Sequence, residues 1–280
     1  MRFAKYQGIG NDFVMLADPD DRLALTPDIV RRLCDRRFGI GGDGVIRVAP
    51  GPDGTDLFMD YVNSDGSIGE MCGNGIRCLA LFARDQGLVS GDSLRIATRA
   101  GIKPVWVEGD RVRVDMGAPM FQPSQIPVTW EGPDALHAKV DLEDQTLEAA
   151  CVSMGNPHAV LFVDDPAAAE VATIGPVIER HDMFPNGVNV EFMTVEGPTR
   201  VRMRVWERGS GETLACGTGA AAVAVVARLL GGTDPDVVVA LPGGDLEVSW
   251  KGSVDDPQPV FMTGPAVESF TGEIDLKELM

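Results

Sequence analysis

Two cysteines occupy equivalent places in a motif that this chain contains twice. Cys72 and Cys216 lie 144 positions apart, and each is followed by Gly-x-Gly and then by an apolar run with helical spacing. This pattern predicts a tight glycine turn that opens a buried helix, with the cysteine at the helix N-terminus. Because a helix N-terminus favours negative charge, we expect it to lower the pKa of each thiol. Two such thiols indicate a paired acid–base site.

The elements that must position these cysteines can be read from periodicity and turn residues. Residues 3–16 predict two strands joined by a glycine-rich turn, and Thr26-Pro27 predicts the start of a helix that ends at Cys34. The other predicted elements are two helices that follow the cysteines, up to residues 83 and 230, and strands at 45–48, 57–62, 94–98, 102–108, 111–116, 237–241, 245–250, 260–264 and 266–274. This mixture of helices and strands indicates an α/β (α+β) protein.

The two halves of the chain repeat one another. Met203–Glu207 matches Met59–Asn63 at an offset of 144, and the block around Cys151–Val160 matches the region of Gly10–Val14 at 145. Blocks in the same order at nearly constant offset predict a duplicated domain. A segment rich in Pro and Gly, residues 117–133, predicts the boundary between domains 1–117 and 118–264, and the segment 265–280 is expected to return to the first domain.

Composition limits the partners. The 280 residues carry a formal net charge of −18, which argues against nucleic acid and anionic membranes. No apolar run is long enough to span a membrane, and the first residues lack a signal-peptide pattern. The five cysteines contain no CxxC pair, so we expect a reducing, cytoplasmic location and no metal site. Cys34, Cys78 and Cys151 are expected to be buried packing residues.

Five blocks of the sequence resemble the diaminopimelate epimerase family. Asn63–Ser67 with Met71–Cys78 looks like the first cysteine signature of that family, and Trp206–Gly219 looks like the second. Further blocks are similar at Gly10–Phe13, Gly155–His158 and Gly187–Phe192. The resemblance covers nearly the whole chain.

The resemblance implies an enzyme that interconverts LL- and meso-diaminopimelate without pyridoxal phosphate or another cofactor, in lysine and peptidoglycan-precursor synthesis. It also implies two pseudo-symmetric domains, each a curled mixed sheet around a central helix, with the active site in the cleft between them, and a homodimer. One departure is Gly44, where some members carry a substrate-contacting Gln. Glycine at this position lacks the side chain for that contact but still allows a backbone contact.

The expected chemistry is inversion of an amino-acid α-carbon. Removing a proton from one face and delivering one to the other requires two groups, and we assign Cys72 and Cys216 as this thiolate–thiol pair. Without a cofactor, backbone N–H groups at the two helix starts must stabilise the carbanion. These donors belong to Gly73, Asn74, Gly217 and Thr218.

The remaining polar residues are expected to hold an amino-acid substrate. Arg208 suits a distal carboxylate, because its guanidinium can bind it bidentately. The other predicted substrate contacts are Asn11, Asn63, Asn156, Asn189 and Glu207. Glu207 is also expected to tune the cysteines, and the resemblance implies the same role for His158.

Two alternatives remain open. Proline and hydroxyproline racemases also pair two cysteines, although their substrate lacks a distal carboxylate for Arg208. A non-catalytic redox sensor would instead join Cys72 and Cys216 in a disulfide.

Overall fold

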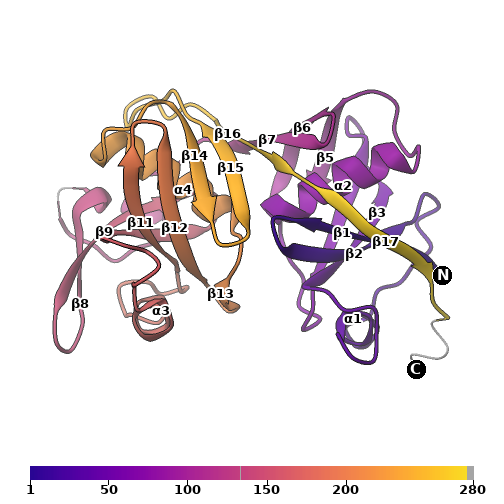
Figure 1. The fold of residues 1–280 in the computed structure, drawn as a ribbon, viewed down its shortest axis with the longest axis horizontal. Coiled ribbons are helices and arrows are strands. Elements are labelled where there is room, and N and C mark those ends of the chain that lie inside the picture. Colours follow the sequence, from indigo (N-terminus) through magenta and orange to yellow (C-terminus); the bar gives the residue numbers. More distant parts are fainter. Residues whose placement is uncertain (133, 276–280) are drawn as a thin grey trace. The chain divides into compact units, whose positions relative to one another are not determined.

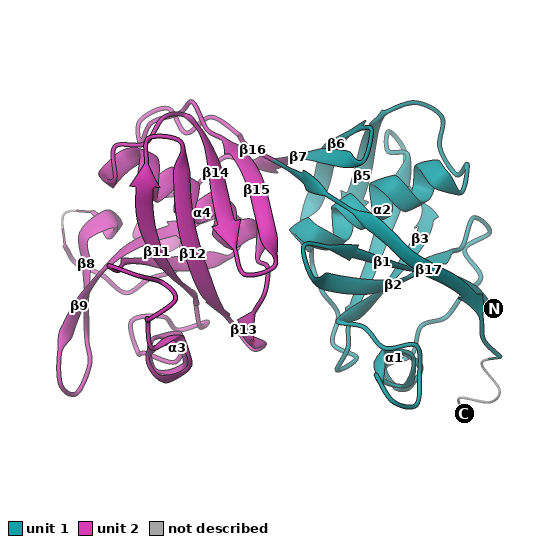
Figure 2. Ribbon diagram, viewed as in Figure 1, with its two compact units in different colours: residues 1–114, 263–280 teal, residues 115–262 magenta. Residues whose placement is uncertain are grey.

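The computed structural model describes residues 1–132 and 134–275, which form two compact units (Figures 1 and 2). Unit 1 combines residues 1–114 with the C-terminal segment that begins at Thr263, and unit 2 comprises residues 115–262. The sequence-based boundaries were 117/118 and 264/265. Residue 133 of the predicted boundary segment and residues 276–280 of the predicted returning segment lie outside the described residues.

Unit 1 is a mixed sheet with two helices (teal in Figure 2). Its elements are β1 (Arg2–Gly8), β2 (Asn11–Ala17), α1 (Pro27–Cys34), β3 (Gly44–Pro50), β4 (Leu57–Asn63), α2 (Gly73–Asp85), β5 (Ser93–Thr98), β6 (Gly101–Glu108), β7 (Arg111–Gly117) and β17 (Val267–Glu273). Strands β2 and β3 pair in parallel, as do β4 and β5, whereas the pairs β1–β2, β3–β4, β5–β6 and β6–β7 are antiparallel. The C-terminal strand β17 lies antiparallel to β1.

The sheet of unit 1 surrounds α2. Residues 73–83 of this helix are all buried, and it packs against β1, β2, β3, β6 and β17. Burial on every side explains the continuous apolar run from Cys78 to Ala83. The two buried polar residues of the first turns, Asn74 and Arg77, make hydrogen bonds to Asn11 Oδ1 and Gly73 O. The shorter α1 is amphipathic instead: Thr26 accepts a hydrogen bond from Ile29 N, Pro27 begins the helix, and Val30, Leu33 and Cys34 are buried.

Unit 2 repeats this arrangement (magenta in Figure 2). Its elements are η1 (Pro123–Gln125), η2 (Ala135–His137), β8 (Ala138–Asp141), β9 (Thr146–Ser153), β10 (Pro157–Phe162), α3 (Val171–Glu179), β11 (Asn189–Gly197), β12 (Arg200–Glu207), β13 (Gly211–Thr213), α4 (Gly217–Leu230), β14 (Asp236–Leu241), β15 (Gly244–Ser249) and β16 (Val260–Pro265). From β9 the pairings run antiparallel to β10, parallel to β11, antiparallel to β12, parallel to β14 and antiparallel to β15. The same alternation runs from β1 to β6, which confirms the predicted duplication of the fold.

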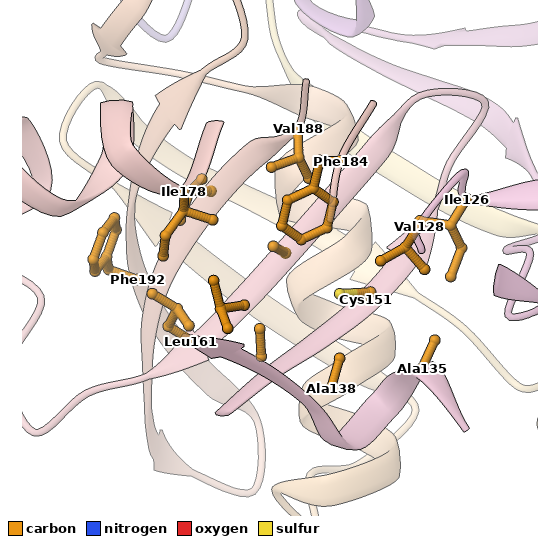
Figure 3. Close-up of a cluster of buried hydrophobic side chains, with 14 of the residues drawn as sticks. Ile126, Val128, Ala135, Ala138, Cys151, Leu161, Ile178, Phe184, Val188 and Phe192 are labelled. Atoms are coloured by element: carbon orange, nitrogen blue, oxygen red, sulfur yellow. The ribbon is translucent and has the colours of Figure 1, made fainter. Parts of the chain in front are cut away.

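The central helix of unit 2 is α4, and a second apolar cluster lies beside it. Residues 219–227 of α4 are all buried, and their small Ala and Val side chains allow the surrounding strands to approach closely. Figure 3 shows the neighbouring cluster, whose members include Ile178 of α3, Phe184, Val188, Cys151 of β9 and Phe192 of β11. Because this core is close-packed, the strands that carry the polar residues of unit 2 are held firmly.

Candidate active site

The predicted site residues divide between the two units. Unit 1 contributes Asn11, Asn63, Cys72, Gly73 and Asn74. Unit 2 contributes Asn156, His158, Asn189, Glu207, Arg208, Cys216, Gly217 and Thr218. Polar contacts connect Asn11 and Asn74 to Cys72, and they connect Thr218, Asn156 and His158 in a line to Cys216. Asn63, Asn189 and Arg208 make their contacts elsewhere in their units.

In unit 1, Cys72 is the N-cap residue of α2, as the sequence predicted. Its Sγ accepts a hydrogen bond from Gly75 N at 3.4 Å, which satisfies one of the amides that the first turn leaves unpaired. Its thiol also donates to Asn11 Oδ1 at 3.6 Å. The sulfur is therefore held between the helix start and the turn that joins β1 and β2.

The Asn11 amide is fixed by a residue that the sequence analysis missed. Asp43 Oδ2 accepts a hydrogen bond from Asn11 Nδ2 at 2.7 Å, and Asp43 Oδ1 accepts one from Arg36 at 2.8 Å. Asn11 Oδ1 consequently faces the thiol and also accepts from Asn74 Nδ2 at 3.2 Å. Asp43 lies inside the glycine-rich turn 39–44, and a carboxylate in such a turn is the sequence feature that could have identified it.

Behind Asn11 lies an ion-pair network centred on Asp12. The Lys5 ammonium lies 2.6 Å from Asp12 Oδ2, and the Arg36 guanidinium binds both carboxylate oxygens, at 2.9 and 2.6 Å. Burial raises the pKa of Asp12, but the hydrogen bonds from Arg36 and Lys5 outweigh it and lower this pKa to about 2. The network anchors the turn that carries Asn11.

Asn63 and Gly44 occupy neighbouring strands of the same sheet. Asn63 ends β4 and donates to Ser67 Oγ at 3.0 Å, within the turn that leads to Cys72. Gly44 pairs with Asn63 across β3 and β4. A Cβ atom at position 44 would lie 2.6 Å from the ring of Tyr61 and 2.7 Å from Val62 O. Close packing against β4 therefore leaves no room for a side chain at this position.

In unit 2, Cys216 is the N-cap residue of α4, and its thiol begins a line of polar contacts. Its Sγ lies 3.6 Å from Thr218 Oγ1, which accepts a hydrogen bond from Asn156 Nδ2 at 3.2 Å. Asn156 Oδ1 in turn lies 3.0 Å from His158 Nε2. Of the predicted residues, Thr218 thus contacts the second thiol directly, and Asn156 and His158 connect to it through Thr218.

The line ends at a second residue that the sequence analysis missed. Glu191 Oε1 lies 2.6 Å from His158 Nδ1, and both side chains are completely buried. Glu191 stands in β11 within a run that is otherwise apolar from Val190 to Met193. A charge inside a buried strand requires a partner, and this was the signal in the sequence.

The surroundings of Cys216 oppose the effect expected from its helix. Burial raises the pKa of the Cys216 thiol well above its ordinary value, and the negative charges of Glu207 and Glu191 raise it further. The net pKa of this thiol is therefore raised and not lowered, contrary to the expectation from the helix N-terminus alone. Burial also raises the pKa of Glu207, despite a hydrogen bond at 2.5 Å from the hydroxyl of Thr213.

Asn189 and Arg208 are neighbours at the end of β12. Asn189 Oδ1 accepts a hydrogen bond from Arg208 N at 3.0 Å, and its Nδ2 donates to Pro157 O at 2.9 Å. The Arg208 guanidinium donates to Asn186 O at 3.0 Å from an exposed position. Asn189 therefore fixes the backbone of the loop that presents the arginine.

The other three cysteines are buried, as predicted. Burial raises the pKa of Cys34, Cys78 and Cys151 to about 12 each, which makes them inert packing residues. All five cysteines are present as thiols. Within residues 1–132 and 134–275 no cluster of His, Cys, Asp and Glu could hold a metal ion. The helices of the same residues are all too short or too polar to cross a membrane.

Comparisons with known proteins point to one family. A family model described as diaminopimelate epimerase matches residues 3–122 and 150–268. A diaminopimelate epimerase of Moorella thermoacetica is 48% identical over 282 residues, which cover 99% of this chain and 100% of the relative. One of Desulfitobacterium hafniense is 48% identical over 280 residues and 97% of each chain.

Solved structures with little sequence identity share the fold. A probable proline racemase from Agrobacterium radiobacter has a TM-score of 0.74 at 15% identity, covering 98% of this chain and 93% of that one. A hydroxyproline epimerase from Agrobacterium vitis has a TM-score of 0.72 at 15% identity, covering 97% and 91%. At this identity the likeness establishes the two-domain fold alone.

Proposed function

The chain belongs to the diaminopimelate epimerase family, and from this premise we propose that it converts LL-2,6-diaminopimelate to the meso isomer without a cofactor. The observation that carries the proposal is the repeated helix start, in which each central helix begins at a cysteine with Gly-x-Gly behind it. It is an isomerase, as its relatives are. We further propose that it acts as a cytoplasmic homodimer on the free amino acid, in lysine and peptidoglycan-precursor synthesis.

The proposed reaction uses the two thiols as a pair. One cysteine, as thiolate, removes the α-proton from one face, and the other delivers a proton to the opposite face. Hence Cys72 and Cys216 exchange roles when the reaction runs in reverse. In each turnover one proton passes from the α-carbon to a thiolate, and one passes from the other thiol to the α-carbon. Because the ionisations of the two thiols are coupled, the apparent pKa values seen in the pH dependence of the reaction belong to the pair and not to either cysteine alone.

Stabilisation of the carbanion is assigned to the helix starts. The backbone N–H groups of Gly73, Asn74, Gly217 and Thr218 lie in the first turns of α2 and α4, where they have no intrahelical acceptor. Donors of this kind stabilise a developing enolate, and loss of one such donor in other enzymes costs about 3–4 kcal/mol. Several together replace the electron sink that a cofactor would supply.

The polar neighbours of each thiol are assigned to substrate binding and to control of the thiols. In unit 1, Asn11 presents its carbonyl oxygen beside Cys72, which suits an ammonium group. Arg208 of unit 2 is assigned to the distal carboxylate, with Asn156 and Asn189 of unit 2 and Asn63 of unit 1 as further contacts. Glu207 and His158 are assigned to the control of Cys216, which the raised pKa values of Glu207 and Cys216 support.

The proline-racemase alternative rests on the fold alone. The structures named for proline and hydroxyproline chemistry are 15% identical to this chain, whereas the diaminopimelate epimerases are 48% identical over almost the whole of it. The exposed Arg208 also suits a substrate with a second carboxylate.

A substrate panel tests the proposal. Fully reduced protein is incubated separately with LL-diaminopimelate, L-proline and trans-4-hydroxy-L-proline, and the stereoisomers are separated by chiral chromatography. We expect turnover of diaminopimelate only, and a large loss of kcat/KM for Arg208→Gln with that substrate. Turnover of proline would favour the racemase alternative. If the reduced protein has no activity and Cys72 and Cys216 readily form a disulfide when oxidant is added, the redox-sensor alternative is favoured.

A further inference from the structure

We propose that Glu191 is a positioning residue for Cys216. Its carboxyl group fixes a line of three side chains that leads to the thiol, namely His158, Asn156 and Thr218. The inference deepens the proposed function, because it concerns the thiol to which that function assigns proton transfer. It gives a role to a buried charge that the proposed reaction does not otherwise use.

The line is continuous, and all of it lies within unit 2. From Glu191 Oε1 to His158 Nδ1 the distance is 2.6 Å, and from His158 Nε2 to Asn156 Oδ1 it is 3.0 Å. Asn156 Nδ2 then lies 3.2 Å from Thr218 Oγ1, which lies 3.6 Å from the sulfur. The five residues come from β11, β10, the turn before β10 and the first turn of α4. No single element could hold them in register.

The contacts define where the protons of His158 lie. With its Nδ2 directed to Thr218, Asn156 turns its carbonyl oxygen to the imidazole, and a carbonyl oxygen only accepts. Nε2 of His158 must therefore carry a proton. A proton must also lie between Nδ1 and Glu191, because two bare lone pairs 2.6 Å apart would repel each other. The contact with Glu191 thus keeps Nε2–H directed at Asn156.

Burial makes this arrangement rigid. His158 and Glu191 both have an exposed side-chain fraction of 0%. The second carboxyl oxygen, Oε2, is buried and has no hydrogen-bond partner among the described residues, so the imidazole is the partner that anchors the group. A Cβ atom on Gly219 would lie 2.8 Å from Glu191 Oε1, which places the carboxyl group against the first turn of α4. Removing it leaves a buried imidazole N without its partner.

The chain contains a natural control for this pair. His137 Nδ1 lies 3.0 Å from Glu148 Oε1, but these side chains are 51% and 62% exposed. Solvent can replace a lost partner at such a site, so breaking this pair has little effect. A variant there makes the same chemical change without reaching the thiol.

The test combines NMR with kinetics in the full-length protein. The variants are Glu191→Leu, which removes the polar contact, Glu191→Gln, whose amide can donate to Nδ1, and Glu148→Gln as control. Nitrogen-15 spectra of the imidazoles report which ring nitrogen carries hydrogen, and the His158 signals are assigned by their loss in His158→Gln. In the wild type we expect a protected Nε2–H on His158.

In Glu191→Leu the ring is no longer anchored through Nδ1, so we expect the Nε2–H signal to lose its protection from exchange with solvent. We also expect kcat to fall by about 100-fold, as when a catalytic group is displaced by about 1 Å. KM should change far less, because the residue does not touch substrate. Glu191→Gln should retain the Nε2–H signal and more activity than Glu191→Leu, and Glu148→Gln should match the wild type in both.

The alkylation of Cys216 gives a second readout. The titratable groups that act on Cys216 in unit 2 include Glu207 of β12 and Glu191 of β11, and His158 of β10 is in contact with Glu191. The negative charge of Glu191 is among the causes that raise the pKa of Cys216. The midpoint of its alkylation with pH should therefore fall in Glu191→Gln. A purely structural role would not move this midpoint in a folded variant.

Several results would overturn the inference. They are a wild-type His158 without hydrogen on Nε2, an unchanged His158 signal in Glu191→Leu, or unchanged kcat in a folded Glu191→Leu. The first needs only the wild type and the assignment variant His158→Gln, so it decides the matter even if Glu191→Leu does not fold. A wild type that leaves diaminopimelate unchanged while His158 responds as expected would instead contradict the proposed function and leave the positioning role intact.

Discussion

The thiol of Cys216 lies in surroundings that oppose its ionisation. A helix N-terminus alone lowers a cysteine pKa, but here burial and two carboxylates raise it well above the ordinary value. The hydroxyl of Thr218 acts in the opposite direction. Burial thus outweighs the helix dipole, because the free energy of removing a thiolate from water is larger than the stabilisation that the first helical turn provides.

This balance predicts the effect of Glu207→Gln. The rate at which iodoacetamide alkylates Cys216 is measured against pH by mass spectrometry, in a Cys72→Ala background. With Glu207 intact, we expect the midpoint of this pH profile to lie above the ordinary thiol pKa of about 8.5. Because a neighbouring negative charge raises a thiol pKa, its removal in Glu207→Gln should lower this midpoint. A wild-type midpoint at or below 8.5, or one that Glu207→Gln leaves unchanged, would contradict this account.

Single residues were predictable where a motif contains them. The positions of Cys72 and Cys216 at the starts of buried helices follow from Gly-x-Gly and the apolar runs behind them. Asp43 and Glu191 were not predicted, although Glu191 lies in the block Gly187–Phe192, because each acts through a partner that is distant in sequence: Asn11 and His158. The upward shift of the Cys216 pKa was not predicted for the same reason, because it depends on charges that other strands contribute.

At the scale of elements, glycine keeps each central helix close to its surroundings. On Gly219 a Cβ atom would lie 2.8 Å from Glu191 Oε1 and 3.2 Å from Cys216 Sγ. On Gly75, at the same place in α2, it would lie 2.7 Å from Ile46 Cδ1 and 3.0 Å from Met59 Cε. The two glycines are equivalent by sequence, yet one faces polar groups of the site and the other faces the core.

This difference predicts opposite outcomes for two matched variants. Gly219→Ala should lower kcat by about 10-fold or more, because it displaces the sulfur and the carboxyl group, while alanine's higher helix propensity offsets part of the strain. Gly75→Ala should chiefly lower stability, by about 1–3 kcal/mol, because it overpacks the core. Turnover and urea unfolding measured together separate the two. Equal effects of both variants on kcat would refute the distinction.

Elements with clear end signals were predictable. Thr26 and Pro27 mark α1, and the cysteine-glycine turns mark α2 and α4. Helix α3 was missed because Pro176 lies inside it and its N-cap residue, Glu170, makes no side-chain cap. The hairpin of β8 and β9 was missed because its turn, residues 142–145, contains no Gly, Pro or Asn, and Asp144 is its single turn-favouring residue.

At the scale of the whole molecule, the chain is a duplicated fold with a strong excess of acidic groups. The formal net charge is −18. Several carboxyl groups have their pKa lowered by hydrogen bonds in the folded protein, namely Asp12, Asp18, Asp35, Asp65 and Asp165. Repetition of the fold was predictable from block offsets. The tertiary contacts that shift these groups were not.

These groups predict acid sensitivity. A carboxyl pKa that is lower in the folded than in the unfolded protein stabilises the fold above the unfolded value of about 3.9, and this stabilisation is lost as pH falls. For Asp12 the loss should continue down to about pH 2. Asp12→Asn should reduce the free energy of unfolding at pH 7 by about 1–2 kcal/mol, after allowing for solvent screening, and should flatten its pH dependence.

Urea unfolding of both proteins between pH 2.5 and 7 measures this. An exposed pair serves as the control: Asp28→Asn breaks the contact with Arg31, and it should change stability by less. A free energy of unfolding that does not vary over this range, or one that Asp12→Asn leaves unchanged, would show that the network around Lys5 and Arg36 does not stabilise the fold.

The central claim is that two thiols exchange a proton with the α-carbon. It is tested most directly by incubating the reduced protein with LL-diaminopimelate in deuterium oxide, alongside Cys72→Ala and Cys216→Ala, and locating deuterium by mass spectrometry and NMR. The account predicts meso product with solvent deuterium at the inverted carbon in the wild type, and no meso product from either variant. Meso product without solvent deuterium, or formed at the wild-type rate by either variant, would contradict it.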